Sequence, residues 1–185
     1  EAHREPWLEN RGYTSARLVS KLKGDWKYGR IEARIKCPGG RGTWAAFWML
    51  PTDWKYGGWP HSGEIDIMEY VGFKSDTVFA TAHTATFTNS KGTENTQGFF
   101  LPDATASFHV YAVEWNADRM DFFVDDVRFN TFKNLHQTSE EWPYDQRFHV
   151  ILNLAVGGNW GGTKGVDESN WPKRMEVDYV RVYSF

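Results

Sequence analysis

Three carboxylates, Glu64, Asp66 and Glu69, fall within the seven-residue run at positions 63–69 and are interleaved with large apolar residues. Acids separated by apolar residues are expected on a strand whose other face is buried, so that the acids point into one cleft. Hydrolysis of a glycosidic bond with retention of configuration needs such a pair, one carboxylate to attack and one to give and take a proton. The alternative is a solvated strand face, which the apolar and aromatic neighbours disfavour.

The spacing of the three acids requires an irregular strand. Side chains alternate along a regular strand, so Glu64 and Asp66 share a face and Glu69 has the opposite parity. We therefore predict a one-residue bulge near Ile67-Met68 that returns Glu69 to the face of the other two acids. Retaining hydrolysis requires the two carboxyl groups to lie ~5–5.5 Å apart, and glutamate side chains are long enough to reach this separation from positions 64 and 69. Mutual repulsion is expected to raise the pKa of at least one acid.

Period-two patterns dominate the chain and predict an all-β sandwich in a single domain, residues 1–185. The clearest is Tyr28–Cys37, in which small and apolar residues alternate with polar ones, as in a half-buried antiparallel strand. Turn residues separate the predicted strands, and no helical stripe is longer than about three turns. The other predicted strands are Thr14–Lys21, Thr43–Leu50, Glu64–Tyr70, Thr77–Phe87, Phe108–Trp115, Met120–Val124, Phe148–Val156 and Met175–Tyr183.

Composition narrows the classes of ligand. Aromatic residues make up 17% of the 185 residues, a surplus typical of a very aromatic core or of a platform on which sugars stack. The net charge is −3 without basic clusters, which disfavours nucleic acid and polysulfated polymers as partners. No apolar run reaches the length of a membrane span, so no membrane partner is expected. The single Cys37 excludes an intrachain disulfide, and four histidines lack zinc-ligand spacing: His3, His109, His136 and His149.

The run Gly-Glu-Ile-Asp-Ile-Met-Glu at residues 63–69 resembles the signature of glycoside hydrolase family 16. The form with the additional methionine is similar to that of the laminarinases (endo-1,3-β-glucanases) and their relatives, the agarases and carrageenases. The resemblance implies a jelly-roll sandwich of two antiparallel sheets with a concave substrate cleft, and a secreted protein. It continues in order through Tyr13–Arg17, Tyr28–Arg34, Gly42–Trp44, Trp48–Leu50, His109–Trp115, Asn153–Gly162 and Val177–Tyr183.

Roles for individual residues follow from this resemblance. It implies that Glu64 is the nucleophile, that Asp66 is an assisting acid that orients it, and that Glu69 is the general acid/base. Trp44 and Trp48 share a strand face and are either core residues or sugar platforms, and the resemblance favours the platform for Trp44. The remaining residues expected to contact substrate are Glu32, Arg34, His83, Trp115 and Asn153 by the resemblance, and Trp160 because it lies in a glycine-flanked loop. For His83, a structural role is the alternative.

The sequence departs from the family pattern at two places. An upstream stretch that carries the first strand is absent from the sequence, so we expect a jelly roll that lacks its amino-terminal strands, with a segment of the same protein as a possible partner. Ala45 stands where laminarinases commonly have proline. Asp178 has the parity of Val180 and Val182, which predicts an inward side chain, and the resemblance assigns the corresponding aspartate to a structural calcium ion. No other cofactor is expected.

The resulting hypothesis is a retaining endo-hydrolase of β-1,3-glucans such as laminarin. A relative that acts on mixed-linkage glucan or agarose is the first alternative, since the same acids would serve it. A carbohydrate-binding module without turnover is the second, because one fold can bind with or without cleavage. Transglycosylation uses the same intermediate and is not separated from hydrolysis by the sequence.

Overall fold

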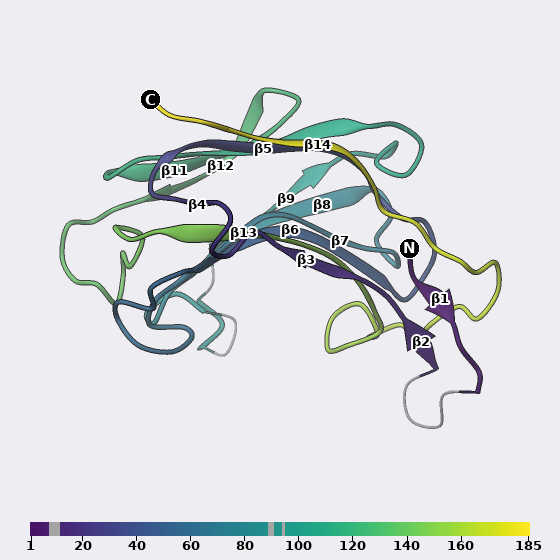
Figure 1. Ribbon diagram of the computed structural model, residues 1–185. Helices are drawn as coiled ribbons and strands as arrows, with labels where there is room; N and C mark the ends of the chain where they lie inside the picture. Colours follow the sequence, from purple (N-terminus) through teal and green to yellow (C-terminus); the bar gives the residue numbers. More distant parts are fainter. Residues whose placement is uncertain (8–11, 89–90, 94) are drawn as a thin grey trace.

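Two antiparallel sheets pack face to face in the computed structural model, which describes residues 1–7, 12–88, 91–93 and 95–185 (Figure 1). The all-β sandwich predicted from the sequence is confirmed. The described residues contain no helix with the length and hydropathy of a membrane span. The five-stranded sheet has the spatial order β12 (Val127–Lys133), β11 (Arg119–Val124), β10 (His109–Trp115), β5 (Gly29–Lys36) and β14 (Glu176–Tyr183).

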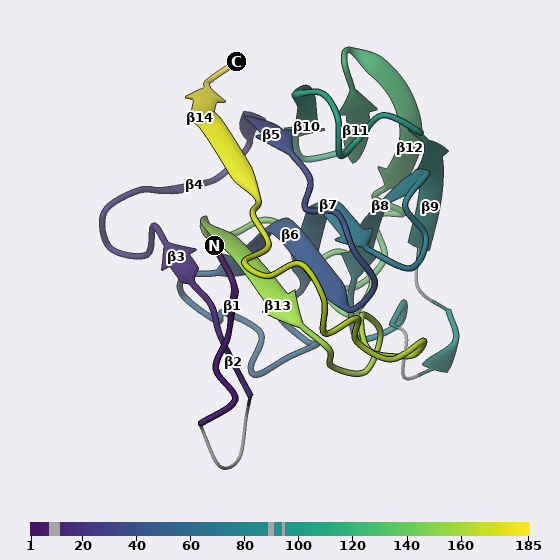
Figure 2. The same ribbon diagram turned by 90° about the vertical axis from the view of Figure 1, so that its right-hand side faces the viewer.

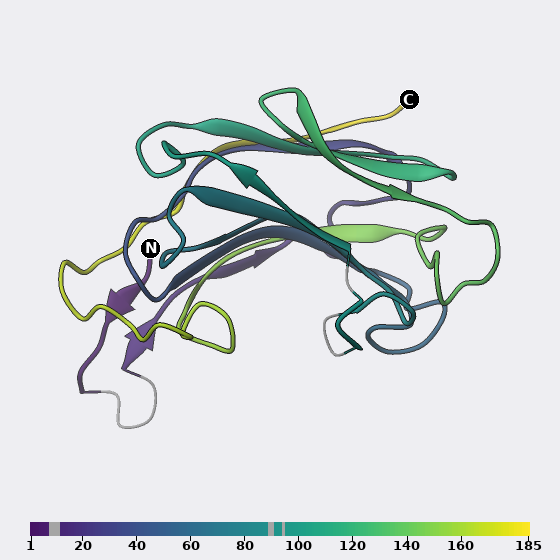
Figure 3. The same cartoon turned by 180° about the vertical axis from the view of Figure 1, so that it is seen from behind.

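The second sheet is seven-stranded and strongly curved. Its concave face is turned away from the five-stranded sheet, as Figures 1 and 3 show. Figure 2 shows β13 and β6 side by side at the centre of this sheet. Its spatial order is β3 (Arg17–Val19), β13 (Phe148–Val156), β6 (Thr43–Pro51), β7 (Glu64–Val71), β8 (Thr77–His83) and β9 (Asn95–Phe100), with β4 (Asp25–Trp26) also beside β13. A separate hairpin consists of β1 (His3–Arg4) and β2 (Tyr13–Thr14).

The hydrophobic core fills the space between the two sheets. Alternate residues of β5 and β6 are buried, as the period-two pattern predicts. Large aromatic side chains from both sheets meet there, which accounts for much of the aromatic surplus. Fully buried members of the core include Phe47, Tyr70, Tyr111, Trp115, Phe122 and Phe148.

Most of the predicted strands are observed, with differences at their ends and four omissions. The predicted strand Thr14–Lys21 is divided between β2 and β3, and the strand predicted to run to Phe87 ends at His83. The strands β1, β4, β9 and β12 were not predicted. In β9 the run Asn95–Gly98 has a single β-branched residue, Thr96, and no apolar/polar alternation, and the strand forms because it pairs with β8.

Candidate active site

A bulge in β7 brings the three acids to one face of the sheet. Asp66 pairs with Thr81 of β8 and Glu69 pairs with Phe79. The paired positions are therefore three residues apart in β7 but only two residues apart in β8. The register between β6 and β7 shifts at the same place. The bulge predicted near Ile67-Met68 is therefore confirmed, and all three acids line one cavity of about 480 Å³.

The cavity lies on the concave face of the seven-stranded sheet. Trp44, Ala46 and Trp48 of β6 line it, whereas Ala45, Phe47 and Met49 of the same strand belong to the core on the other face. The cavity therefore crosses β3, β13, β6 and β7 on the side away from the five-stranded sheet. Its remaining lining residues are Ser15, Ala16, Arg17, Asn153, Leu154 and Ala155.

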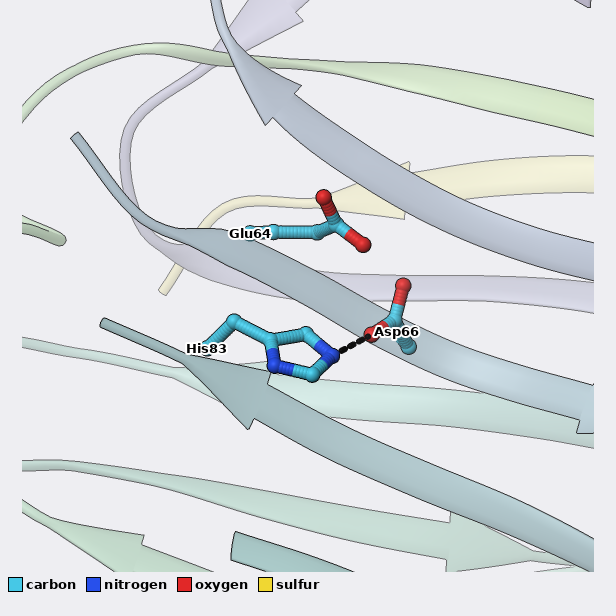
Figure 4. Close-up of side chains that lie close together, drawn as sticks. All are labelled: Glu64, Asp66 and His83. Atoms are coloured by element: carbon cyan, nitrogen blue, oxygen red, sulfur yellow. Dashed lines mark ion pairs between the residues drawn. The ribbon is translucent and has the colours of Figure 1, made fainter. Parts of the chain in front are cut away.

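Each acid has a distinct environment in the cavity. Asp66 is 3% exposed, and its Oδ2 lies 3.1 Å from Nε2 of His83 on β8 (Figure 4). Glu64 at the start of β7 is only partly buried. Trp44 Nε1 donates a hydrogen bond of 3.1 Å to Oε1 of Glu69, which stabilises the ionised form of that carboxylate.

Burial and mutual repulsion raise the pKa of all three acids. Burial raises the pKa of Glu64 well above its usual range, and the charge of Asp66 adds to the effect. The pKa of Asp66 is likewise raised well above its usual range by burial and by Glu69. Burial raises the pKa of Glu69 to about 7, while the hydrogen bond from Trp44 acts in the opposite direction. A carboxyl group with a pKa near 7 can both donate and accept a proton near neutral pH.

Trp48 and Asn153 form a second contact across the cavity floor. Trp48 Nε1 donates a 2.7 Å hydrogen bond to Oδ1 of Asn153, and the guanidinium of Arg17 lies 4.8 Å from the centre of the Trp48 ring. Arg17 therefore covers part of one face of the Trp48 ring. Arg17 was not predicted as a site residue, although it ends a segment that carries the family resemblance, because nothing in the local pattern points to a contact with Trp48.

Trp160 extends the aromatic surface beyond the acids. Its ring packs edge-on against Trp44, with centroids 5.8 Å apart, and against Phe79, with centroids 5.1 Å apart. The loop residue predicted as a sugar platform thus lies next to Trp44, at the end of the cavity where Glu69 is located. His83 lies beside Asp66 on the neighbouring strand β8 and is only 7% exposed.

Three residues expected to contact substrate lie elsewhere, and the structure corrects these expectations. Trp115 is fully buried between the sheets, where it packs against Tyr28 and Phe148 with centroid distances of 5.3 and 5.4 Å. Glu32 and Arg34 belong to β5 of the five-stranded sheet. They project from the face opposite its core residues, where Glu32 accepts a 2.9 Å hydrogen bond from the side chain of Arg30.

Asp178 does not point inward. The register of β14 shifts between Val177 and Tyr179, so Asp178 lies in a bulge, where its side chain is 51% exposed and pairs with Arg34 at 2.9 Å. The predicted inward direction of Asp178 is therefore wrong, and Asp178 belongs to no group of three His, Cys, Asp or Glu side chains that could hold a metal ion among the described residues.

Comparison with known proteins gives a consistent assignment. The family model described as "Glycosyl hydrolases family 16" matches residues 3–181. A β-glucanase of Rhodothermus marinus is 50% identical over 190 residues, which cover 99% of this chain and 66% of that protein, so the chain spans about two thirds of that relative.

Solved structures agree with this result. The laminarinase structure from Rhodothermus marinus matches with a TM-score of 0.94 and 48% identity, covering 99% of this chain and 75% of that one. A mutant of SCLam, described as a non-specific endo-β-1,3(4)-glucanase, matches with a TM-score of 0.95 and 37% identity, covering 100% of this chain and 73% of that one. The similarity extends over the whole sandwich.

Proposed function

We propose that this chain, which belongs to family 16 of the glycosyl hydrolases, hydrolyses internal β-1,3-glucosidic bonds of laminarin-type glucans with retention of configuration. The observation that carries the proposal is the bulge in β7, because it brings Glu64 and Glu69 to a single cavity. Relatives named as glucan endo-1,3-β-glucosidases support the choice of substrate class.

The two glutamates have complementary roles in the proposed double displacement. Glu69, with a pKa of about 7, protonates the departing glycosidic oxygen. Glu64 attacks the anomeric carbon, and the glycosyl-enzyme ester that results is hydrolysed by a water molecule that Glu69 then deprotonates.

Asp66 keeps the nucleophile ready for attack. Asp66 and Glu64 line the same cavity, and burial together with the negative charge of Asp66 raises the pKa of Glu64. Because the three acids repel one another, the protonated form of each is favoured by the charge of its neighbours. Glu64 is nucleophilic when the proton of the Glu64–Asp66 pair resides on Asp66, the more buried of the two.

A mixed-linkage substrate is the second candidate. SCLam, whose fold matches over the full length of this chain, is described as acting on β-1,3(4)-glucan, and the structure of its mutant presents a 1,3-β-D-cellobiosyl-glucose at the active site. The cavity of this chain is an open groove lined by tryptophans, a surface that accepts glucosyl rings joined in either way.

Product analysis tests the proposal. The protein is incubated with laminarin, mixed-linkage β-1,3-1,4-glucan and agarose, new reducing ends are measured, and the anomer formed first is identified by proton NMR. We expect β-anomers from laminarin, and loss of turnover in Glu64→Ser but not in Glu176→Ser, which removes an exposed strand glutamate on β14. An initial α-anomer would refute the assignment of Glu64, and binding of laminarin without new reducing ends would identify a binding module.

A further inference from the structure

We propose that Glu64, Asp66 and His83 form a binding site for a borderline dication of the zinc type, and that an ion bound there closes the catalytic cavity to substrate. The three side chains come from adjacent positions on β7 and β8, where Glu64 pairs directly with His83. The site itself stands on geometry alone. Only its effect on turnover rests on the proposed function.

The ligand atoms already lie close together. Each of the three residues offers one atom, and these atoms all lie within 4.8 Å of one another. Asp66 Oδ2 and His83 Nε2 are 3.1 Å apart. Two ligands held at usual bond lengths on one tetrahedral zinc ion are roughly 3.3–3.6 Å apart. Figure 4 shows the Glu64 carboxylate on the same side of the sheet as this pair. The longest separation would have to shorten when an ion binds, and Glu64, the least buried of the three, is the side chain that would move.

The buried atoms of the cluster have unused capacity for a ligand. Asp66 is 3% exposed and His83 is 7% exposed. Within the described part of the chain, Asp66 Oδ2 accepts no hydrogen bond despite its proximity to His83, and His83 Nδ1 has no partner. Buried polar atoms without partners are uncommon and call for an explanation. An ion between Asp66 Oδ2 and His83 Nε2 would replace the direct ion pair of these two atoms by two metal–ligand bonds.

The donor set selects the class of metal. One imidazole nitrogen and two carboxylate oxygens leave a fourth position open toward the cavity, which is the arrangement that exchangeable zinc sites have. Calcium requires six to eight oxygen ligands and magnesium a near-ideal octahedron, so both are expected to bind poorly. His83 Nδ1 lacks the acceptor that usually orients a ligating histidine, a deficit that typically weakens metal affinity by about 10–100-fold. We therefore expect micromolar, exchangeable binding.

An ion at this position would use the carboxylate that performs the proposed attack. Glu64 and Asp66 also line the cavity, so the ion and a glucosyl ring would compete for the same space. Zinc inhibition is then competitive with laminarin.

Calorimetric titration with zinc chloride tests the site without reference to turnover. We expect one micromolar site in the wild-type protein, at least tenfold weaker binding in His83→Gln, and no such site for calcium chloride. His136→Gln is the matched control, because it removes a histidine that also lies near an aspartate, Asp118 at 3.4 Å, but on the exposed surface. Glu64→Gln provides a second variant, also with weakened binding, should His83→Gln fail to give a cooperative thermal transition.

The outcomes separate the two proposals. Zinc affinity that is unchanged in both His83→Gln and Glu64→Gln, or equally lost in His136→Gln, overturns the site. Binding that depends on His83 together with non-competitive inhibition of laminarin hydrolysis overturns the closure of the cavity. Zinc binding that depends on His83 in a protein that hydrolyses none of the tested glucans refutes the proposed function and leaves the metal site standing.

Discussion

Replacing Trp44 with phenylalanine should move the pH dependence of the reaction. The substitution keeps an aromatic ring in the cavity and removes the indole N–H that donates to Glu69 at 3.1 Å. Hydrogen bonds to charged groups contribute ~1.5–3 kcal/mol, and one pKa unit corresponds to ~1.4 kcal/mol. Because Glu69 is partly exposed, we take the lower end and expect its pKa to rise from about 7 by about one unit.

The pH profile of kcat/KM for laminarin is the assay, since its alkaline limb reports the pKa of the general acid in the free enzyme. A rise of about one unit would make the activity of the variant relative to wild type increase by about fivefold between pH 6 and pH 8. Trp48→Phe is the control: its indole donates to Asn153, so that variant should lose activity without a shift of the limb. An unmoved alkaline limb in Trp44→Phe, or one moved to lower pH, would refute the role of this hydrogen bond.

Three further substitutions test other parts of the structure. Because burial raises the folded-state pKa of Asp66, its ionisation costs stability as pH rises above the unfolded pKa of ~4. Asp66→Asn should therefore abolish activity yet raise the Tm by about 2–4 °C at pH 8, with little gain at pH 4, in calorimetric scans; a lower Tm at pH 8 contradicts this. In Gly72→Ala the new Cβ collides with the carbonyl oxygen of Gly40, so the free energy of unfolding measured in urea should fall by ~1–3 kcal/mol. Gly39→Ala is the control: its new Cβ meets open space, and the free energy of unfolding should fall by less than ~1 kcal/mol. Trp160→Ala should raise the KM for laminarin by about two- to tenfold with kcat nearly unchanged; an unchanged KM would exclude Trp160 as a platform.

The sequence predicted strands and site residues correctly where the strand pattern and the chemistry of the site constrain the same residues. Alternation in Tyr28–Cys37 predicted the strand β5 and its buried face, because a half-buried strand shows a period of two in its sequence. Thr43–Leu50 was predicted as a strand, but both of its faces are apolar, so the sequence did not say which face is buried. Trp44 and Trp48 were placed correctly on one face because side chains alternate along a strand. The pairing of His83 with Asp66, however, joins two strands, and no local pattern encodes which residues become neighbours across them.

The misplaced residues share one cause. Glu32, Arg34 and Trp115 lie on β5 and β10, whose alternation is as clear as that of the cavity strands. Alternation states that a strand has one buried and one polar face, but it does not state to which of two sheets the strand belongs. Both strands pair within the five-stranded sheet, so their polar residues face away from the cavity and Trp115 packs in the core. Tertiary context alone decides this placement.

Two bulges show why parity succeeded at one place and failed at another. At Ile67-Met68 the odd spacing between Asp66 and Glu69 conflicted with the need for one shared face, and that conflict predicted the irregularity that β7 contains. At Asp178 no chemical requirement conflicted with a regular strand, so the sequence did not predict the bulge that turns this carboxylate outward to Arg34. A bulge shifts every later residue to the opposite face. A bulge is therefore predictable from sequence where the side chains on either side of it must act together. This condition holds in β7, which carries the three acids, and not in β14.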